Sequence, residues 1–257
     1  VIEEALSEEA LDAWMDIKIM IMNNTDLSAL REYIKSSLPA VPQEVADAMV
    51  WEYIKALRDY LDTMTRYILD ADMTEALIYA YQPDGTFDRT MLSEGQNSFL
   101  DSIGDLEIGW VDLEGMIEPR VRYDRIAEWA GPISAVMREY VSLLAMGNTA
   151  APAEDFALRI SYQELGEKTL RIEDFLGPAA DAPYRGDMEE LYFNYLYLFL
   201  SGADTPSVLD IQRYYETDTL AMNPEAEAAF QQVVDTQPDS ATAAAVADWW
   251  GYLSGLI

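Results

Sequence analysis

The sequence predicts an all-α fold, an antiparallel stack of helix pairs with one short irregular insertion. Apolar residues recur three and four residues apart through most of the chain, which is the period of a helix with one buried face. Proline and glycine separate these segments at positions typical of helix starts and ends. Two segments, 169–202 and 226–255, each read as a helix, a turn and a second helix closing on Leu-Ser-Gly. Such pairs cannot bury their apolar faces alone, so neighbouring pairs are expected to cover them.

The composition indicates a folded, strongly acidic protein. Half of the 257 residues are apolar, which suffices for the core of one large domain or two small ones. The 47 Asp and Glu residues outnumber the 16 Lys and Arg residues, giving a net charge of −31, and no basic cluster is present. This pattern argues against nucleic acid and against an anionic membrane surface as partners. It points instead to a solvated surface, to cations or to basic protein partners.

The chain contains no Cys and no His. Thiol nucleophiles, zinc sites built from Cys and His, and catalytic arrangements that depend on histidine are therefore excluded. The chemistries that remain are carboxylate chemistry, a lysine base, Tyr or Ser nucleophiles that act without histidine, and metals that bind oxygen ligands, such as calcium or magnesium. No organic cofactor is predicted.

Three helices are expected at the N-terminal end. The first runs from Ser7 to about Met22, with acidic residues in its first turn. Asp26 caps a second helix, which stops before a break that contains two prolines. Pro42 opens the longest helix, which reaches about Asp70. Its apolar stripe faces a core and consists of Val45, Met49, Tyr53, Leu57, Tyr60, Leu61, Met64 and Ile68.

Residues 84–118 form the predicted irregular insertion. Asp72 and Glu75 resemble a capping box ahead of a short helix, and residues 82–85 are typical of a turn. Glycines then separate short apolar pieces, and residues 106–113 alternate as a strand does. The insertion therefore includes a candidate β-hairpin.

A domain boundary is predicted after two further helices. Pro119 is expected to open a helix through Trp129, and another follows Gly131 and Pro132 and ends at Gly147. Residues 147–153 are small and turn-prone, as linkers are. They would separate an N-terminal helical bundle, residues 1–146, from a helical repeat-like region, residues 152–257. The alternative is a loop within a single domain.

The helix from Asp187 to Gly202 is the expected centre of the second region. Its apolar and aromatic run is interrupted only by Asn194, so both of its faces should be covered. Acidic residues at the start and Gly202 at the end favour a helix over a strand. The run is too short to span a bilayer, which needs about 20 apolar residues.

Four more helices are expected around this central one. The first covers about residues 153–176. Thr205 and Pro206 would cap a short helix that carries Leu209 and Ile211. The last two helices start at Pro224 and near residue 240.

Part of this region resembles known helical proteins. Residues 224–250, above all Phe230-Gln-Gln-Val-Val-Asp-Thr-Gln-Pro-Asp-Ser-Ala-Thr-Ala, resemble the helix-turn-helix of tetratricopeptide-like repeats in bacterial envelope lipoproteins, although the usual Trp, Gly and Tyr positions of the first repeat helix are missing. Residues 158–175, 190–202 and 204–210 resemble exported, all-helical proteins of uncharacterised function from Gram-positive bacteria. The resemblance implies an envelope location and a non-enzymatic function, and it supplies no catalytic residues.

Acidic residues of the insertion are candidate calcium ligands. Carboxylates on an irregular backbone supply the hard oxygen atoms that calcium prefers. Their spacing does not match the helix-loop-helix calcium pattern, so a solvated acidic loop is the alternative. The candidate ligands are Asp101, Asp105, Glu107, Asp112 and Glu114.

Carboxylate pairs beside aromatic rings suit a second alternative, a polysaccharide hydrolase. Cleavage of a glycosidic bond needs an acid, a base or nucleophile, and a ring on which a sugar can stack. Asp112 and Glu114 lie beside Trp110, and Glu189 and Glu190 lie near Tyr192. With 47 acidic residues in the chain, such neighbours are also expected by chance.

The main functional hypothesis is a non-catalytic module that binds a protein or peptide on a helical groove. Aromatic side chains of the C-terminal region either pack in the core or, where exposed, anchor a partner. The candidate anchors are Tyr192, Tyr195, Tyr214, Tyr215, Trp249 and Trp250.

The expected location is outside the cytoplasm, either secreted or lipid-anchored in a bacterial envelope. The chain begins at Val1, which suggests that a leader has been removed, and the absence of Cys fits an exported bacterial protein. The alternative is a cytoplasmic protein of a salt-adapted organism, in which the acidity is an adaptation to salt.

Overall fold

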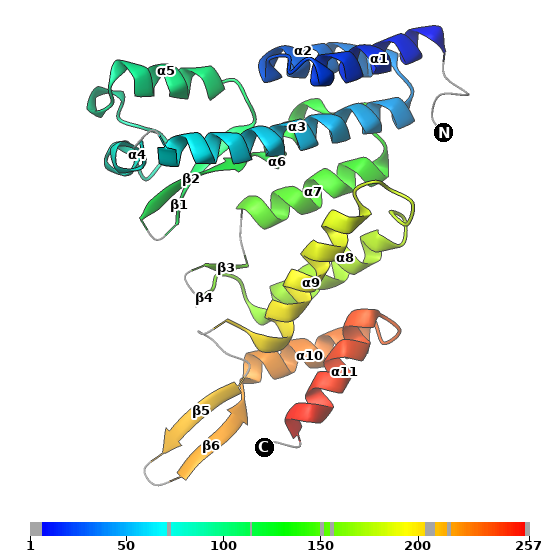
Figure 1. Cartoon of the computed structure of the whole chain (residues 1–257). Coiled ribbons are helices and arrows are strands. Elements are labelled where there is room, and N and C mark those ends of the chain that lie inside the picture. The colour runs from blue at the N-terminus through cyan, green and yellow to red at the C-terminus, as the bar shows by residue number, and fades with distance from the viewer. Residues whose placement is uncertain are drawn as a thin grey trace. The chain divides into compact units, whose positions relative to one another are not determined.

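A computed structural model describes residues 7–70, 73–113, 115–149, 152–154, 157–203, 209–214 and 217–254 (Figure 1). The fold of these residues is mainly helical and includes three separate two-stranded antiparallel sheets. The chain divides into two compact units, Val1–Asn148 (unit 1) and Thr149–Ile257 (unit 2). The division falls within residues 147–153, the segment that the sequence marks as a linker.

Unit 1 begins with three helices that contact one another, α1 (Glu8–Met22), α2 (Leu27–Ser37) and α3 (Gln43–Asp70), with the short 3₁₀ helix η1 (Leu38–Ala40) before α3. The predicted starts of α1 and α2 are confirmed, because the Ser7 and Asp26 side chains accept hydrogen bonds from the backbone N–H groups of Ala10 and Ala29. The predicted stripe of α3 is largely buried, while Tyr60 and Leu61 are half-buried.

The insertion contains more regular structure than the sequence predicts. The short helix predicted ahead of it is α4 (Thr74–Ala80). The insertion itself comprises η2 (Arg89–Met91), α5 (Glu94–Ile103) and the hairpin of β1 (Ile108–Leu113) and β2 (Met116–Val121), whose second strand continues past residue 118. The hairpin is confirmed. The helix α5 was not predicted, although Ser93 and Gln96 form a capping box at its start. The predicted capping residue Asp72 lies outside the described residues.

Unit 1 ends with α6 (Tyr123–Trp129) and α7 (Ala135–Thr149). The prediction that Pro119 opens a helix is wrong, because Pro119 lies in β2 opposite Trp110. A strand with only one neighbour tolerates a proline, since its missing N–H can face away from the ladder.

Unit 2 comprises two very short strands, β3 (Ala153–Glu154) and β4 (Ala157–Leu158), then α8 (Tyr162–Leu176), α9 (Arg185–Ser201), the hairpin of β5 (Leu209–Tyr214) and β6 (Thr217–Met222), α10 (Pro224–Thr236) and α11 (Ala241–Ser254). Helix α8 contacts α9 and α10, and α11 contacts the other three helices. The central helix is confirmed, with Gly202 as its C-terminal cap at a φ of 73°.

Two predictions for unit 2 are wrong. The helix expected from residue 153 begins only at Tyr162, where the Ser161 side chain accepts a hydrogen bond from the N–H of Glu164. The helix expected to carry Leu209 and Ile211 is the strand β5, which pairs with β6 from Leu209↔Met222 to Tyr214↔Thr217. Apolar and polar residues alternate at 209–212, and threonines recur in β6, which is typical of strands.

Close helix packing in unit 2 depends on Gly166 of α8. A Cβ atom at this position would lie 2.9 Å from Cζ of Phe199 in α9 and 3.2 Å from Cγ2 of Val233 in α10. The absent side chain therefore lets three helices approach one another. Unit 2 thus holds two successive helix pairs, α8 with α9 and α10 with α11, while the finer tetratricopeptide-like stacking stays a prediction.

Candidate functional site

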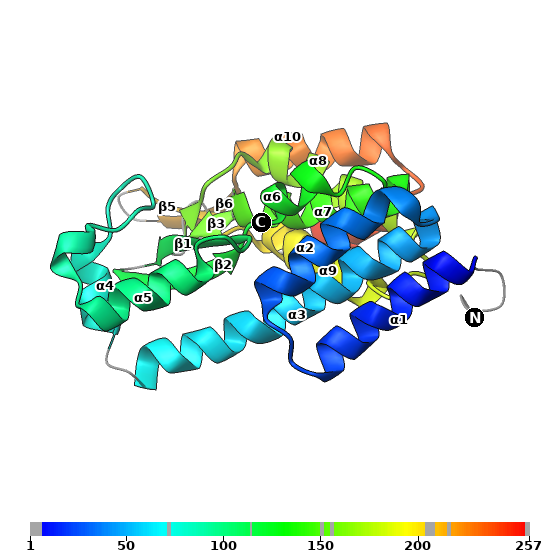
Figure 2. The same ribbon diagram turned by 90° about the horizontal axis from the view of Figure 1, so that it is seen from above.

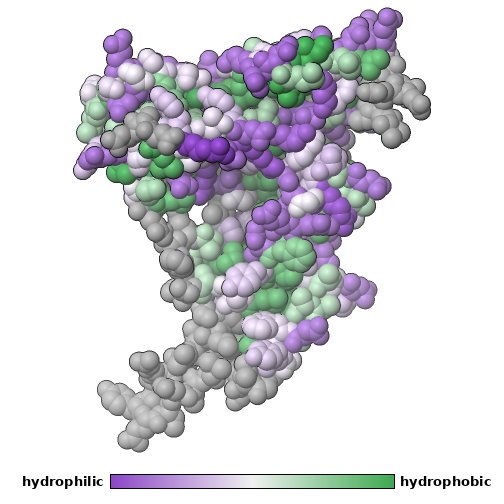
Figure 3. Space-filling model, viewed as in Figure 1, coloured by the Kyte–Doolittle hydropathy of each residue, from purple (hydrophilic) through white to green (hydrophobic). Residues whose placement is uncertain are grey.

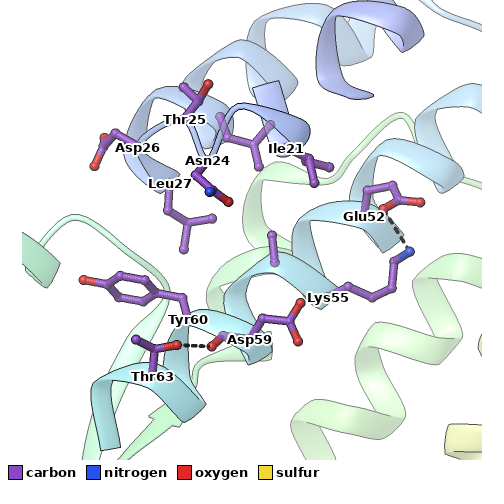
Figure 4. A pocket seen from close by; sticks show the side chains of 12 residues that line it. Ile21, Asn24, Thr25, Asp26, Leu27, Glu52, Lys55, Asp59, Tyr60 and Thr63 are labelled. Carbon is purple, nitrogen blue, oxygen red and sulfur yellow. Dashed lines mark hydrogen bonds and ion pairs between the residues drawn. The ribbon is translucent and has the colours of Figure 1, made fainter. Parts of the chain in front are cut away.

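A groove in unit 1 lies between the turn that joins α1 to α2 and the outward face of α3 (Figure 4). Its volume is about 540 Å³, which lies within the range of sites that bind small molecules. The lining residues are Ile21, Asn24, Thr25, Asp26, Leu27, Leu30, Glu52, Lys55, Ala56, Asp59, Tyr60 and Thr63.

The turn between α1 and α2 forms one wall of this groove. Asn24 has a φ of 50°, the left-handed conformation that Asn adopts more readily than most residues. The N–H of Thr25 then donates to the carbonyl of Met20, and Asp26 caps α2. Because the chain reverses so tightly, polar side chains of the turn and apolar side chains of the two helices line the same wall.

The opposite wall is one face of α3. Glu52, Ala56, Asp59 and Thr63 recur at three- and four-residue spacing and therefore lie along one side of the helix. The Thr63 hydroxyl donates to the backbone carbonyl of Asp59 at 3.1 Å, so it is not paired with a base that could activate it as a nucleophile.

Negatively charged side chains outnumber positively charged ones in the lining of the groove. Glu52 forms ion pairs with Lys18 at 2.6 Å and with Lys55 at 2.8 Å. Burial alone would raise the pKa of Glu52, but the hydrogen bonds from these two lysines outweigh burial and hold that pKa below its ordinary value. Asp26 and Asp59 form no ion pair with the described residues, so the rim carries uncompensated negative charge.

Glu107 is the centre of a second polar cluster in unit 1. Only 1% of its surface is exposed, and its carboxylate accepts hydrogen bonds from Arg31 Nε at 2.6 Å, from Trp129 Nε1 at 2.9 Å and from the Tyr53 hydroxyl. Burial and the charge of Glu107 raise the pKa of Tyr53, so the phenol stays protonated as a donor. Burial alone would lower the pKa of Arg31, but its hydrogen bond and charge interaction with Glu107 raise it.

A cavity of about 210 Å³ adjoins this cluster and is lined by Arg31, Lys35, Asp105, Leu106, Glu107, Arg125, Glu128 and Trp129. The three donors occupy the carboxylate of Glu107, and one of them carries a positive charge. Because both of its oxygens accept hydrogen bonds and it is paired with Arg31, Glu107 acts as a structural anion.

The predicted calcium ligands are not brought together. Asp101 pairs with Arg89 at 3.3 Å, Asp112 accepts the Gly115 N–H at 2.8 Å within the hairpin turn, and Asp105 lies beside the small cavity. Within the described residues, no three Asp or Glu side chains are placed to hold a metal ion. Glu114 lies outside the described residues. We therefore no longer assign the other four candidates, Asp101, Asp105, Glu107 and Asp112, to a calcium site.

The carboxylate pairs proposed for a hydrolase are separated from both cavities. Asp112 is used in the hairpin turn, and Glu189 pairs with Arg185 one helical turn away at 2.7 Å. Neither residue lines the groove or the smaller cavity. Neither of these two recesses therefore serves either carboxylate pair.

The predicted aromatic anchors divide into buried and half-buried residues. Tyr192 and Tyr195 are buried, so their rings cannot contact a partner and we no longer regard them as anchors. The Tyr192 hydroxyl pairs with Thr242 Oγ1 at 3.1 Å. Trp249 and Trp250 are half-buried. Trp249 donates to the carbonyl of Leu200 at 2.7 Å. Tyr215 and the side chain of Tyr214 lie outside the described residues.

The exposed rings of α9 are not among the candidate anchors named above. Phe193 and Tyr197 are 63% and 69% exposed, so the expectation that both faces of this helix are covered is wrong. Figure 3 shows green and pale colours beside purple ones over the part of unit 2 where α9 faces the viewer. Helical spacing could have identified these two residues. Tyr192, Tyr195 and Phe199 share the buried face of the helix, so positions 193 and 197 lie on the opposite face.

Comparison of the chain with models of protein families, with curated proteins and with solved structures finds no match in any of the three. The likeness to exported helical proteins therefore stays a prediction. None of the described helices combines the length and the apolar character needed to cross a membrane.

Proposed function

We propose that the protein is a non-catalytic binding module whose groove in unit 1 takes a short cationic segment of a partner protein. The observation that supports this function is the pairing of an apolar lining, from Leu27, Leu30 and Ala56, with the uncompensated carboxylates of Asp26 and Asp59. A segment with Lys or Arg beside an apolar side chain complements both. The charge of the whole chain, −31, would also attract such a segment.

The groove is a better candidate for binding than for catalysis. Its one ion-paired carboxylate, Glu52, is held by two lysines, and the Thr63 hydroxyl is committed to a backbone carbonyl. A general acid or base needs a carboxylate poised to exchange a proton near neutral pH. The lowered pKa of Glu52 moves that group away from such a role. A secreted or envelope location is part of the proposal, and fractionation of the producing cells tests it.

The test is a selection of random short peptides on the full chain. We expect selected peptides to place Lys or Arg next to Leu, Ile or Phe, and Asp59→Lys to weaken their binding at least about tenfold. Asp62→Lys is the matched control, because Asp62 is exposed on the same helix but does not line the groove. Equal binding to the two variants, or selection of acidic peptides, would contradict the proposed function.

A further inference from the structure

Helix α1 carries a second apolar face that points away from its core contacts. Ala10 and Ile17 are its buried residues. On another side, Met15, Ile19 and Met22 are 46%, 49% and 79% exposed at spacings of four and three residues. Figure 2 shows α1 at the outer edge of unit 1. Flexible methionine side chains on a helix are suited to contact with a partner whose shape they can follow.

This stripe (Met15, Ile19 and Met22) is continuous with one edge of the groove. Met15, Lys18 and Met22 follow one another at three- and four-residue spacing, so Lys18 lies in the same row as the two methionines. The Lys18 ammonium reaches Glu52 on the opposite wall of the groove, and Ile21 lines the groove itself. A ligand lying on the stripe would therefore meet the groove at the C-terminal end of α1.

The surroundings of the stripe are negatively charged. Glu8 and Asp12 are exposed and lie on the same side of α1 as Met15 and Ile19. Asp26 and Asp59 lie at the groove end, while the charge of Lys18 is balanced by Glu52. A second copy of this chain would bring acidic residues against acidic residues, which charge repulsion opposes. A cationic ligand is attracted.

We propose that the stripe and the groove form one docking surface for a cationic amphipathic helix of a partner protein. The apolar face of that helix packs on Met15, Ile19 and Met22, and a Lys or Arg side chain at its end lies against Asp59. The stripe rises about 10 Å along α1, so two to three turns of the partner cover it. This inference rests on the proposed function and specifies the conformation of the partner.

The experiment uses a synthetic peptide of about 14 residues in which Leu recurs at three- and four-residue spacing and Lys fills the other positions, so that a helix has one apolar face. A scrambled peptide of the same composition lacks that face. Isothermal titration measures both peptides against the full chain and against a stripe variant with Met15→Gln, Ile19→Gln and Met22→Gln. A control variant carries Met91→Gln and Met116→Gln, which change exposed methionines outside the groove and the stripe.

We expect the stripe variant to bind the amphipathic peptide at least about tenfold more weakly than the unmodified chain, and the control variant to bind it equally well. The scrambled peptide should bind weakly, and with similar affinity, to the unmodified chain and to the stripe variant. Because the replaced residues are exposed, circular dichroism should show the stripe variant folded as before.

The outcomes separate this inference from the proposed function. If Asp59→Lys weakens peptide binding and the stripe variant does not, the docking surface is overturned and the groove stands. If neither change matters, both are overturned. Binding of the unmodified chain, but not of the stripe variant, to phosphatidylcholine vesicles would make the stripe a membrane contact and overturn the inference. Sedimentation that shows a dimer only with the stripe intact would do the same.

Discussion

Glu107 ties together elements that are distant in sequence. Its carboxylate joins Arg31 of α2, Tyr53 of α3 and Trp129 of α6, while its carbonyl accepts the N–H of Arg122 at 2.8 Å. Removing one partner of a buried ion pair leaves the other charge uncompensated. We predict that Glu107→Ala lowers the free energy of unfolding by about 3–5 kcal/mol, measured by urea denaturation.

Two further variants sharpen this prediction. Glu118→Ala removes an exposed carboxylate from the neighbouring strand and should change stability by less than about 0.5 kcal/mol. Tyr53→Phe removes one of the three donors and should cost about 1–2 kcal/mol. A loss below about 1 kcal/mol for Glu107→Ala would show that the cluster is not a structural centre.

The ion pairs of Glu52 predict a dependence of stability on pH. Its pKa is held below the ordinary value of 4.5, so the folded state favours the charged form. The stabilisation is present above the unfolded pKa and is lost as pH falls through the folded pKa. Glu52→Gln should therefore destabilise the protein more at pH 7 than at pH 3, as measured by denaturation at both values. An equal effect at the two pH values would contradict this linkage.

At the scale of elements, the contact of α8 with α9 and α10 predicts the effect of filling Gly166. The rings and methyl groups that a Cβ would meet are buried, so they cannot move aside freely. Gly166→Leu should lower the free energy of unfolding by about 1–3 kcal/mol or more, through overpacking. Gly251→Ala is the control, since nothing lies within 4 Å and alanine favours a helix by about 0.5–1 kcal/mol. Similar melts for the two variants would refute the close approach.

Helix caps and long stripes were the elements that the sequence could predict. Ser7, Asp26 and Gly202 act locally, so their roles are visible without knowledge of the fold. The hairpin at 209–222 was missed because Thr205 and Pro206 look like a helix start, whereas strand pairing depends on a partner elsewhere in the chain. Pro119 was assigned to a helix start for a similar reason, because proline often opens helices. It also fits a strand that has only one neighbour, as in β2.

The candidate site was less predictable than the fold. Glu107 was a candidate only as a calcium ligand, because its hydrogen-bond partners lie 76, 54 and 22 residues away and no local pattern indicates them. The groove likewise depends on a turn at Asn24 meeting α3 some thirty residues later. Tyr192 and Tyr195 were candidates because they are aromatic, and only the packing of α9 shows which ring positions face outward.

For the molecule as a whole, the net charge of −31 predicts a general response to salt rather than a specific response to calcium. Sodium chloride should raise the melting temperature, because screening relieves repulsion among the acidic residues. Calcium and magnesium chloride at equal low concentrations should act alike, since no metal-binding group of three carboxylates exists among the described residues. Thermal melts followed by circular dichroism measure both effects. A melting temperature that rises with calcium but not with magnesium would support a calcium site after all.

The shared ion pairs of Glu52 also give the groove a chemical reporter. Lys18 and Lys55, two of the four lysines in the chain, each place their ammonium group against this carboxylate. Each ion pair holds its ammonium group against the carboxylate, whereas a lysine released from the pair extends into solvent, where an acetylating reagent reaches it. A cationic ligand that competes for Glu52 would therefore speed acetylation at both positions, so mass spectrometry of the acetylated chain would measure occupancy of the groove without an added label.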